Sequence, residues 1–65
     1  MQIQLNGNLI NTESKNILEL LVEYAIEQKS IAVAVNTEII KQEKWQSYTI
    51  KENDTIECLT FMGGG

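Results

Sequence analysis

Residues 55–65 read TIECLTFMGGG, a stretch in which an apolar strand pattern leads directly into three consecutive glycines. Apolar and polar residues alternate along its first part, which is the pattern of a strand whose successive side chains point to opposite faces. Glycine lacks a Cβ atom, so the end of the stretch is narrow and reaches backbone angles closed to other residues. We expect a domain over residues 1–61 that holds out a flexible glycine tail, residues 62–65, with the Gly65 carboxylate as its last group.

The alternation also predicts which side chains of this strand face solvent. If Ile56 and Cys58 face the interior, then Leu59 and Phe61 face the other way. A sheet that is covered by one helix leaves that second face partly in water. Exposed apolar side chains next to the tail often mark a surface for a protein partner, although a covering loop is an alternative.

Composition limits the classes of function. A chain of 65 residues forms one small domain. It has no histidine and a single cysteine, Cys58, which excludes an iron–sulfur cluster, a cysteine-based zinc site and a Cys-His nucleophile. We therefore expect a protein that is not an enzyme and binds no metal and no cofactor of its own. Cys58 is interpreted as a small buried hydrophobic residue with an inert thiol.

Charge and hydropathy narrow the partners and the location. The net charge is −4 and all five basic residues are lysine, which favours a basic protein surface as the partner over nucleic acid. The sequence has no run of about 20 apolar residues, so it predicts no membrane span, and the N-terminus does not resemble a secretion signal. A lone thiol fits a reducing compartment, and we expect the cytoplasm or the plastid stroma.

The rest of the chain predicts one helix and several short strands. Met1–Leu5 alternates, Asn6-Gly7 is a strong hairpin signal, and residues 8–11 form the return strand. Asn16 and Glu19 form a capping box at the start of an amphipathic helix. In this helix, the glutamates at positions 19, 23 and 27 are expected to form a solvated stripe, while the burial of residues 18, 22 and 26 is left open.

Residues 31–35 form a short apolar run that is typical of a buried strand, and short strands are expected around residues 39–40 and 48–50. Trp45 is expected to close the core with its indole N–H near water. One helix can cover one face of a sheet, so the order of elements predicts a two-layer α+β domain with four to five strands. The last strand is expected to lie centrally, beside the first.

This order of elements and the tail resemble the β-grasp, ubiquitin-like fold. Within that superfamily the chain resembles the sulfur carrier family of thiamine (thiazole) biosynthesis. The matching residues span the whole chain: residues 1–8, Asn16-Ile17-Leu18-Glu19-Leu20-Leu21, Ala32-Val33-Ala34-Val35-Asn36, Glu38-Ile39-Ile40, Trp45, Asn53-Asp54-Thr55-Ile56-Glu57 and Phe61-Met62-Gly63-Gly64-Gly65. The family often has threonine at the position of Asn16 and a more hydrophobic residue at that of Cys58.

The resemblance implies a mechanism and a set of partners. An E1-like adenylyltransferase would use MgATP to adenylate the Gly65 carboxylate, and a cysteine desulfurase or other persulfide donor would convert it to a thiocarboxylate. Thiazole synthase would then accept the sulfur. Gly63 and Gly64 would thread through a narrow channel, while Leu59, Phe61 and Met62 would supply apolar docking area.

Three alternatives stay open from the sequence. The small subunit of molybdopterin synthase has the same tail and chemistry but is usually longer. A protein modifier would form an isopeptide bond through Gly65 after the same activation. A plain β-grasp interaction module would use no sulfur chemistry, and its glycines would be incidental.

Overall fold

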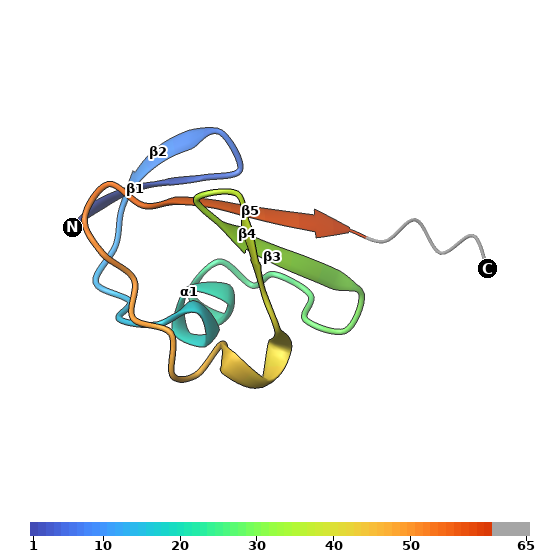
Figure 1. The fold of residues 1–65 in the computed structure, drawn as a ribbon. Coiled ribbons are helices and arrows are strands. Elements are labelled where there is room, and N and C mark those ends of the chain that lie inside the picture. The colour runs from blue at the N-terminus through green and yellow to red at the C-terminus, as the bar shows by residue number, and fades with distance from the viewer. Residues whose placement is uncertain (61–65) are drawn as a thin grey trace.

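The computed structural model describes residues 1–60, in which a five-stranded sheet packs against one α-helix (Figure 1). The elements are β1 (Gln2–Leu5), β2 (Asn8–Asn11), α1 (Ile17–Glu23), β3 (Ile31–Val35), β4 (Glu38–Ile40), the 3-10 helix η1 (Gln42–Lys44) and β5 (Thr55–Thr60). This is the predicted α+β architecture of the β-grasp fold. Phe61 and the tail predicted over residues 62–65 lie outside the described residues.

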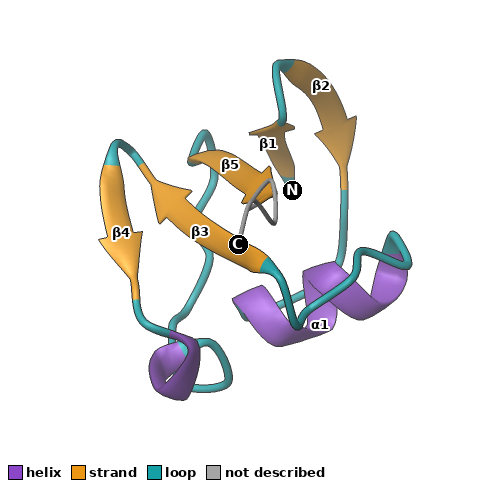
Figure 2. Ribbon diagram, turned by 90° about the vertical axis from the view of Figure 1, so that its right-hand side faces the viewer, coloured by secondary structure: helices purple, strands orange, loops and turns teal. Residues whose placement is uncertain are grey.

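The final strand is the centre of the sheet, as its apolar character predicts. The strand order is β2-β1-β5-β3-β4, with β5 parallel to β1 and antiparallel to β3. Figure 2 shows the sheet as one layer and α1 as the second, lying across one face of the sheet. Because a parallel neighbour requires a crossover, the helix and the long return loop separate β1 from β5 in the sequence.

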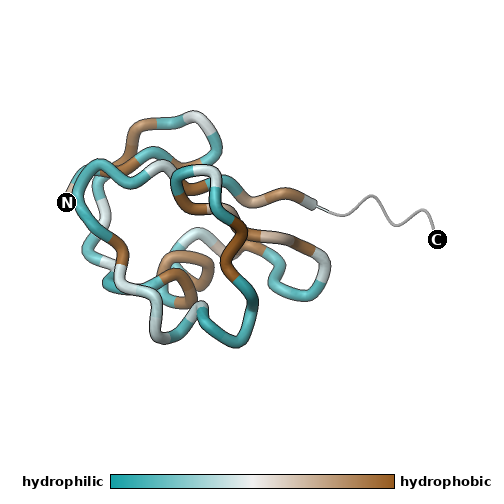
Figure 3. The backbone as a smooth tube through the Cα atoms, viewed as in Figure 1, coloured by the Kyte–Doolittle hydropathy of each residue, from teal (hydrophilic) through white to brown (hydrophobic). Residues whose placement is uncertain are grey.

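The core lies between the helix and the sheet, where the hydrophobic segments of the chain face one another (Figure 3). The helix contributes Ile17, Leu20 and Leu21, all without exposed surface. The sheet contributes every second residue along its strands, because alternate side chains of a strand point to the same face. These inward residues include Ile3, Leu5, Val33, Val35, Ile40 and Ile56.

Two tight turns end the hairpins, and they point in opposite directions along β5 because β1 is parallel and β3 antiparallel to it. Asn6 and Gly7 both have positive φ, which fits the two-residue hairpin turn predicted between β1 and β2. Asn36 and Thr37 also both have positive φ, at 51° and 74°, between β3 and β4. A β-branched residue at positive φ is strained, so Thr37 holds an unfavourable conformation in an otherwise regular hairpin.

Asn16 caps the helix as predicted, but the predicted glutamate stripe is shorter: residues 19, 23 and 27 are all exposed, yet residue 27 lies beyond the end of the helix. Asn16 caps the helix by accepting a hydrogen bond from the Glu19 N–H, and the Glu19 carboxylate accepts one from the Lys15 N–H. The helix ends at Glu23, whose carboxylate turns to the preceding loop and accepts hydrogen bonds from the hydroxyls of Thr12 and Ser14. These two hydrogen bonds lower the pKa of the Glu23 carboxyl. The helical periodicity of the sequence does not predict these hydrogen bonds, because the helix is only seven residues long and ends at Glu23.

The segment between β4 and β5 departs from two predictions. Trp45 is buried in the core, but its indole N–H donates to the Ile40 carbonyl at 2.9 Å instead of reaching water. The strand expected over residues 48–50 is absent from the described chain, where Thr49 forms an isolated bridge with Asn16. Tyr48 and Ile50 are half-buried and buried, so their apolar character serves packing in an irregular segment.

The β3–β4 turn yields a stability prediction in which two neighbouring glycine substitutions act in opposite directions. Thr37→Gly relieves the positive-φ strain, and we expect the free energy of unfolding to rise by about 1 kcal/mol. Asn36→Gly removes a side chain that donates to Asp54 and accepts from the Thr55 N–H, and we expect a loss of about 1–2 kcal/mol. Urea denaturation with an unchanged slope measures both values. Destabilisation by Thr37→Gly would contradict the assignment of strain.

Candidate functional site

The base of the candidate site is the strand β5, which leads directly to residues 61–65. Its first half is tied to the chain on both sides. On one side the Gln4 N–H donates to the Asp54 carbonyl and the Asn6 N–H to the Ile56 carbonyl, both at 2.9 Å. On the other side the Asn36 N–H donates to the Thr55 carbonyl at 2.8 Å. The start of β5 is therefore fixed by backbone hydrogen bonds from β1 and β3.

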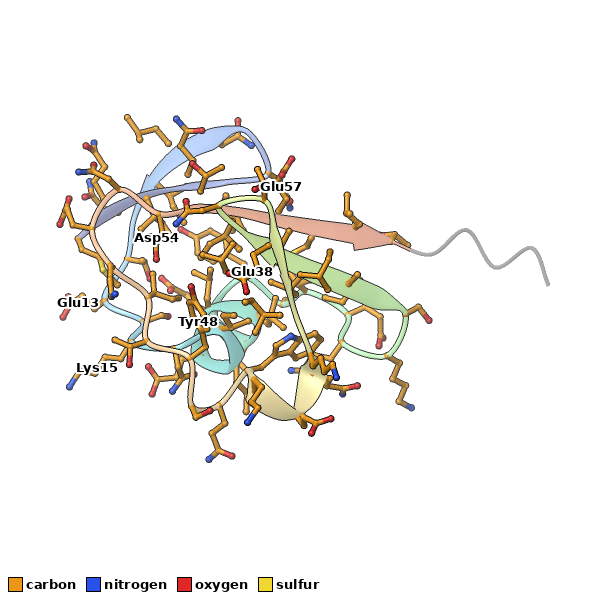
Figure 4. The ribbon with its side chains drawn as sticks, viewed as in Figure 1. Glu13, Lys15, Glu38, Tyr48, Asp54 and Glu57 are labelled. Atoms are coloured by element: carbon orange, nitrogen blue, oxygen red, sulfur yellow. The ribbon has the colours of Figure 1, made fainter. Side chains whose placement is uncertain are left out.

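Side chains reinforce this attachment. The buried Asp54 carboxylate accepts from the Asn36 side-chain amide at 3.0 Å and from the Lys51 N–H at 2.9 Å, while the Asn36 side-chain oxygen accepts from the Thr55 N–H at 2.9 Å. Asp54 thus closes the tight turn predicted before the strand and joins it to the β3–β4 turn. Figure 4 shows Asp54 at the beginning of β5 and Glu57 further along it.

The outer face of the sheet carries an apolar patch next to the end of β5. Leu59 is 52% exposed and pairs across the strands with Ala32, and Ile39 is 57% exposed and pairs with Ala34. We call these four residues the outer patch. Glu57 lies on the same face, because it is two positions from Leu59 along β5, and it is exposed. The result is an apolar surface with an acidic neighbour.

The single thiol of the chain points the other way. Ile56 is fully buried and Cys58 half-buried on the inner face, as the alternation predicts. Burial raises the pKa of the Cys58 thiol, so the reactive thiolate form is less populated than in an exposed cysteine. The interpretation of Cys58 as an inert packing residue therefore fits its position.

Of the predicted docking and tail residues, the structure places Leu59 alone. It lies on the exposed face expected for it. Phe61, Met62, Gly63, Gly64 and Gly65 lie outside the described residues, so the roles predicted for them stay predictions.

The sequence reasoning missed Ile39 as part of the same face. A signal was present, because two consecutive isoleucines in one strand must point to opposite faces, and Ile40 is the buried one. It also missed that the Asn6 side chain accepts from the Cys58 N–H at 2.7 Å. That contact joins residues 52 positions apart, so no local pattern indicates it.

The described residues hold few features of other site types. Within residues 1–60 no group of three or more histidine, cysteine or acidic side chains is placed to hold a metal ion. In the same range no helix has the length and apolar character needed to cross a bilayer. The shallow hollow next to Ile39 is lined by residues of β4 and of the segment from Lys41 to Tyr48.

Comparison with known proteins gives one consistent result. Residues 3–65 match the profile of the ThiS family. The sulfur carrier protein ThiS of Bacillus subtilis (strain 168) is 35% identical over 65 residues, which cover 97% of this chain and 98% of that protein. A thiamine biosynthesis protein (ThiS) from Geobacter metallireducens, known from a crystal structure, is 32% identical with a TM-score of 0.87, and both chains are fully covered.

A second kind of relative is much longer. The thiazole synthase of Magnetococcus marinus (strain ATCC BAA-1437 / JCM 17883 / MC-1) is 33% identical over 66 residues, which cover all of this chain but 20% of that protein. A unit similar to this chain therefore occurs within a polypeptide that is named for thiazole synthase.

The two faces of β5 are expected to differ sharply in their tolerance of substitution. Ile56→Ala opens a cavity in the core and should lower the free energy of unfolding by about 2–5 kcal/mol. Leu59→Glu changes an exposed side chain and should alter it by less than about 0.5 kcal/mol. Chemical denaturation of both variants measures these values. A large loss from Leu59→Glu would mean that the outer patch is part of the folded core.

Proposed function

The chain belongs to the ThiS family and is a sulfur carrier protein of thiamine biosynthesis, and from this we propose that the sulfur travels as a thiocarboxylate on Gly65. The observation that carries the proposal is the extent of the family match, which runs through the three glycines to residue 65. The protein is a carrier and not an enzyme, so other proteins perform the chemistry. We place it in the cytoplasm or the plastid stroma.

The chemistry begins with an unreactive group. A carboxylate is a poor electrophile because its charge is shared by two oxygens and neither is a good leaving group. An adenylyltransferase with MgATP would join the Gly65 carboxylate to AMP and release pyrophosphate. The terminal sulfur of a persulfide, from a cysteine desulfurase or another donor, would then displace AMP and form an acyl disulfide. A thiol would cleave the S–S bond and leave the thiocarboxylate.

The residues of this chain supply position and access in these steps. The fixed first half of β5 sets where the tail begins relative to the domain, which reduces the freedom lost on docking. Gly63 and Gly64 would pass through a narrow channel in the adenylyltransferase, since they have no side chain to clash. The outer patch, with Phe61 and Met62, would supply apolar contact area, and Glu57 and the net charge of −4 would favour a basic rim on the partner.

We further propose thiazole synthase as the protein that accepts the sulfur. The support is the relative named thiazole synthase, in which a unit similar to this chain occupies a fifth of the polypeptide. Molybdopterin synthesis, protein modification and a plain interaction module are the alternatives that the following experiments distinguish.

Sulfur loading is tested by the mass of the intact protein. Incubation with the cognate adenylyltransferase, MgATP and a persulfide donor should raise the mass by the difference between sulfur and oxygen. Deletion of Gly65, or Gly64→Phe in the proposed channel, should abolish the gain without changing the melting temperature. Cys58→Ser should load like the wild type, because the proposed site of loading is the Gly65 carboxylate and not the thiol.

Omission of ATP is the essential control in this experiment. Oxidation of either methionine adds nearly the same mass, but it does not depend on ATP. A gain of one whole sulfur atom that persists without Gly65 and disappears in Cys58→Ser would indicate a persulfide on the thiol and overturn the proposal.

Docking through the outer patch is tested by two substitutions of the same kind on the same face of the sheet. Leu59→Glu should weaken the complex with the adenylyltransferase roughly tenfold or more, since it loses apolar burial and adds an uncompensated charge. Leu9→Glu is the matched control: Leu9 is 63% exposed, but it pairs with Gln4, which lies beside the other end of β5. Titration calorimetry measures both affinities. Equal weakening by the two variants would indicate a general charge effect.

A further inference from the structure

The end of β5 has a neighbouring strand on one side only. β3 pairs with β5 from Ile56 to Thr60, whereas β1 pairs with β5 only at Thr55 and Ile56. Figure 1 shows the same asymmetry, because β5 extends past the turn at which β1 returns into β2. Beyond that turn, the described chain places no strand beside β5 on the β1 side.

The hydrogen bonds of β5 show which backbone groups face this open side. The N–H and C=O of a strand residue point to the same side, and the side alternates from one residue to the next. The Thr55 N–H and C=O bond to Asn36 on the β3 side. The Ile56 carbonyl accepts from the Asn6 N–H, and the Cys58 N–H donates to the Asn6 side chain, both on the β1 side.

Continuing the alternation assigns the remaining groups. The Cys58 carbonyl and the N–H and carbonyl of Thr60 face the β1 side. Among residues 1–60 no hydrogen bond reaches these three groups. They form a short open edge, which we define as the Cys58–Thr60 edge, and it immediately precedes residues 61–65.

Asn6 marks the boundary of this edge. Its backbone N–H makes the last backbone hydrogen bond from the β1 side to β5. Its side chain then accepts a hydrogen bond from the Cys58 N–H, which would bond to β1 if that strand were longer. At the following residue a Cβ built on Gly7 would meet no heavy atom within 4 Å. The chain therefore ends its own pairing with a side chain and leaves the edge accessible.

We propose that an extended segment of thiazole synthase pairs with the Cys58–Thr60 edge and continues the sheet in the position that β1 vacates. This rests on the proposed function, in which thiazole synthase accepts the sulfur from Gly65. A strand added at this edge would be aligned with the tail, and exposed edges are sites of such pairing. Thiazole synthase is the partner that the comparison supports, since a unit like this chain occurs within a polypeptide of that name.

The size of the edge defines what the pairing does. Three backbone groups allow at most three hydrogen bonds, each of which contributes about 1 kcal/mol net. That is too little for a stable complex, so the pairing would set the register of the tail while the outer patch supplies affinity.

Amide hydrogen exchange tests the pairing directly. The Thr60 N–H should exchange rapidly in the free carrier and at least tenfold more slowly with thiazole synthase present. The Cys58 N–H, already bonded to Asn6, should change much less. Protection of Thr60 by raising the carrier concentration alone, or by the adenylyltransferase and not by thiazole synthase, would overturn the proposed occupant. No protection under any of these conditions would overturn the site.

A proline substitution provides the matched variant. Thr60→Pro removes the N–H that faces the open side, where β3 makes no use of it, so the domain should stay folded. It should weaken binding to thiazole synthase about fivefold relative to Thr60→Ala, which keeps the N–H. Equal affinities of the two variants would overturn the inference. ATP-dependent sulfur loading of the wild type distinguishes failure of this inference from failure of the proposed function. Loading without protection of the Thr60 N–H contradicts only this inference. Absence of loading contradicts the proposed function.

Discussion

The structure depends on the central position of β5 between β1 and β3. Hydrogen bonds reach its first residues from both sides, and Ile56 is buried completely beneath them. A strand held in this way cannot shift by one residue without moving Ile56 to the solvent face and Leu59 into the core. The register of β5 therefore fixes the direction in which the chain leaves the domain at Thr60, and the proposed sulfur chemistry depends on that direction.

Two asparagines in turns supply much of this restraint. Asn6 and Asn36 both adopt positive φ, which asparagine tolerates better than most residues, and both also bond β5 through their side chains. Each residue thus ends a hairpin and attaches it to the central strand. Glycine would satisfy the turn geometry equally well, but it would leave the Cys58 or the Thr55 N–H without its partner.

The fold was predictable because its signals are local or periodic. The Asn6-Gly7 turn, the Asn16 cap and the alternation along residues 55–60 each determine a neighbouring conformation, and their order indicates the two-layer architecture. The failures have a common cause in tertiary contacts. Trp45 donates a hydrogen bond to the Ile40 carbonyl, and Glu23 accepts hydrogen bonds from two loop hydroxyls. Neither partner is indicated by the periodic pattern of the element concerned. At the candidate site, Leu59 followed from alternation, whereas Asn6 acts across 52 positions.

The distribution of groups along β5 fits a protein that is handled by others. The strand has neighbours on two sides at Thr55 and Ile56 and on one side at Thr60, so the constraint on the backbone decreases toward the tail. Burial raises the pKa of the Cys58 thiol, while Leu59, one residue further, is exposed and available for contact. Rigid anchoring and an accessible end oppose each other in a domain of this size. A central strand that extends beyond one of its neighbours combines the two properties. The sheet stabilises the start of the strand, and a partner can pair with its end.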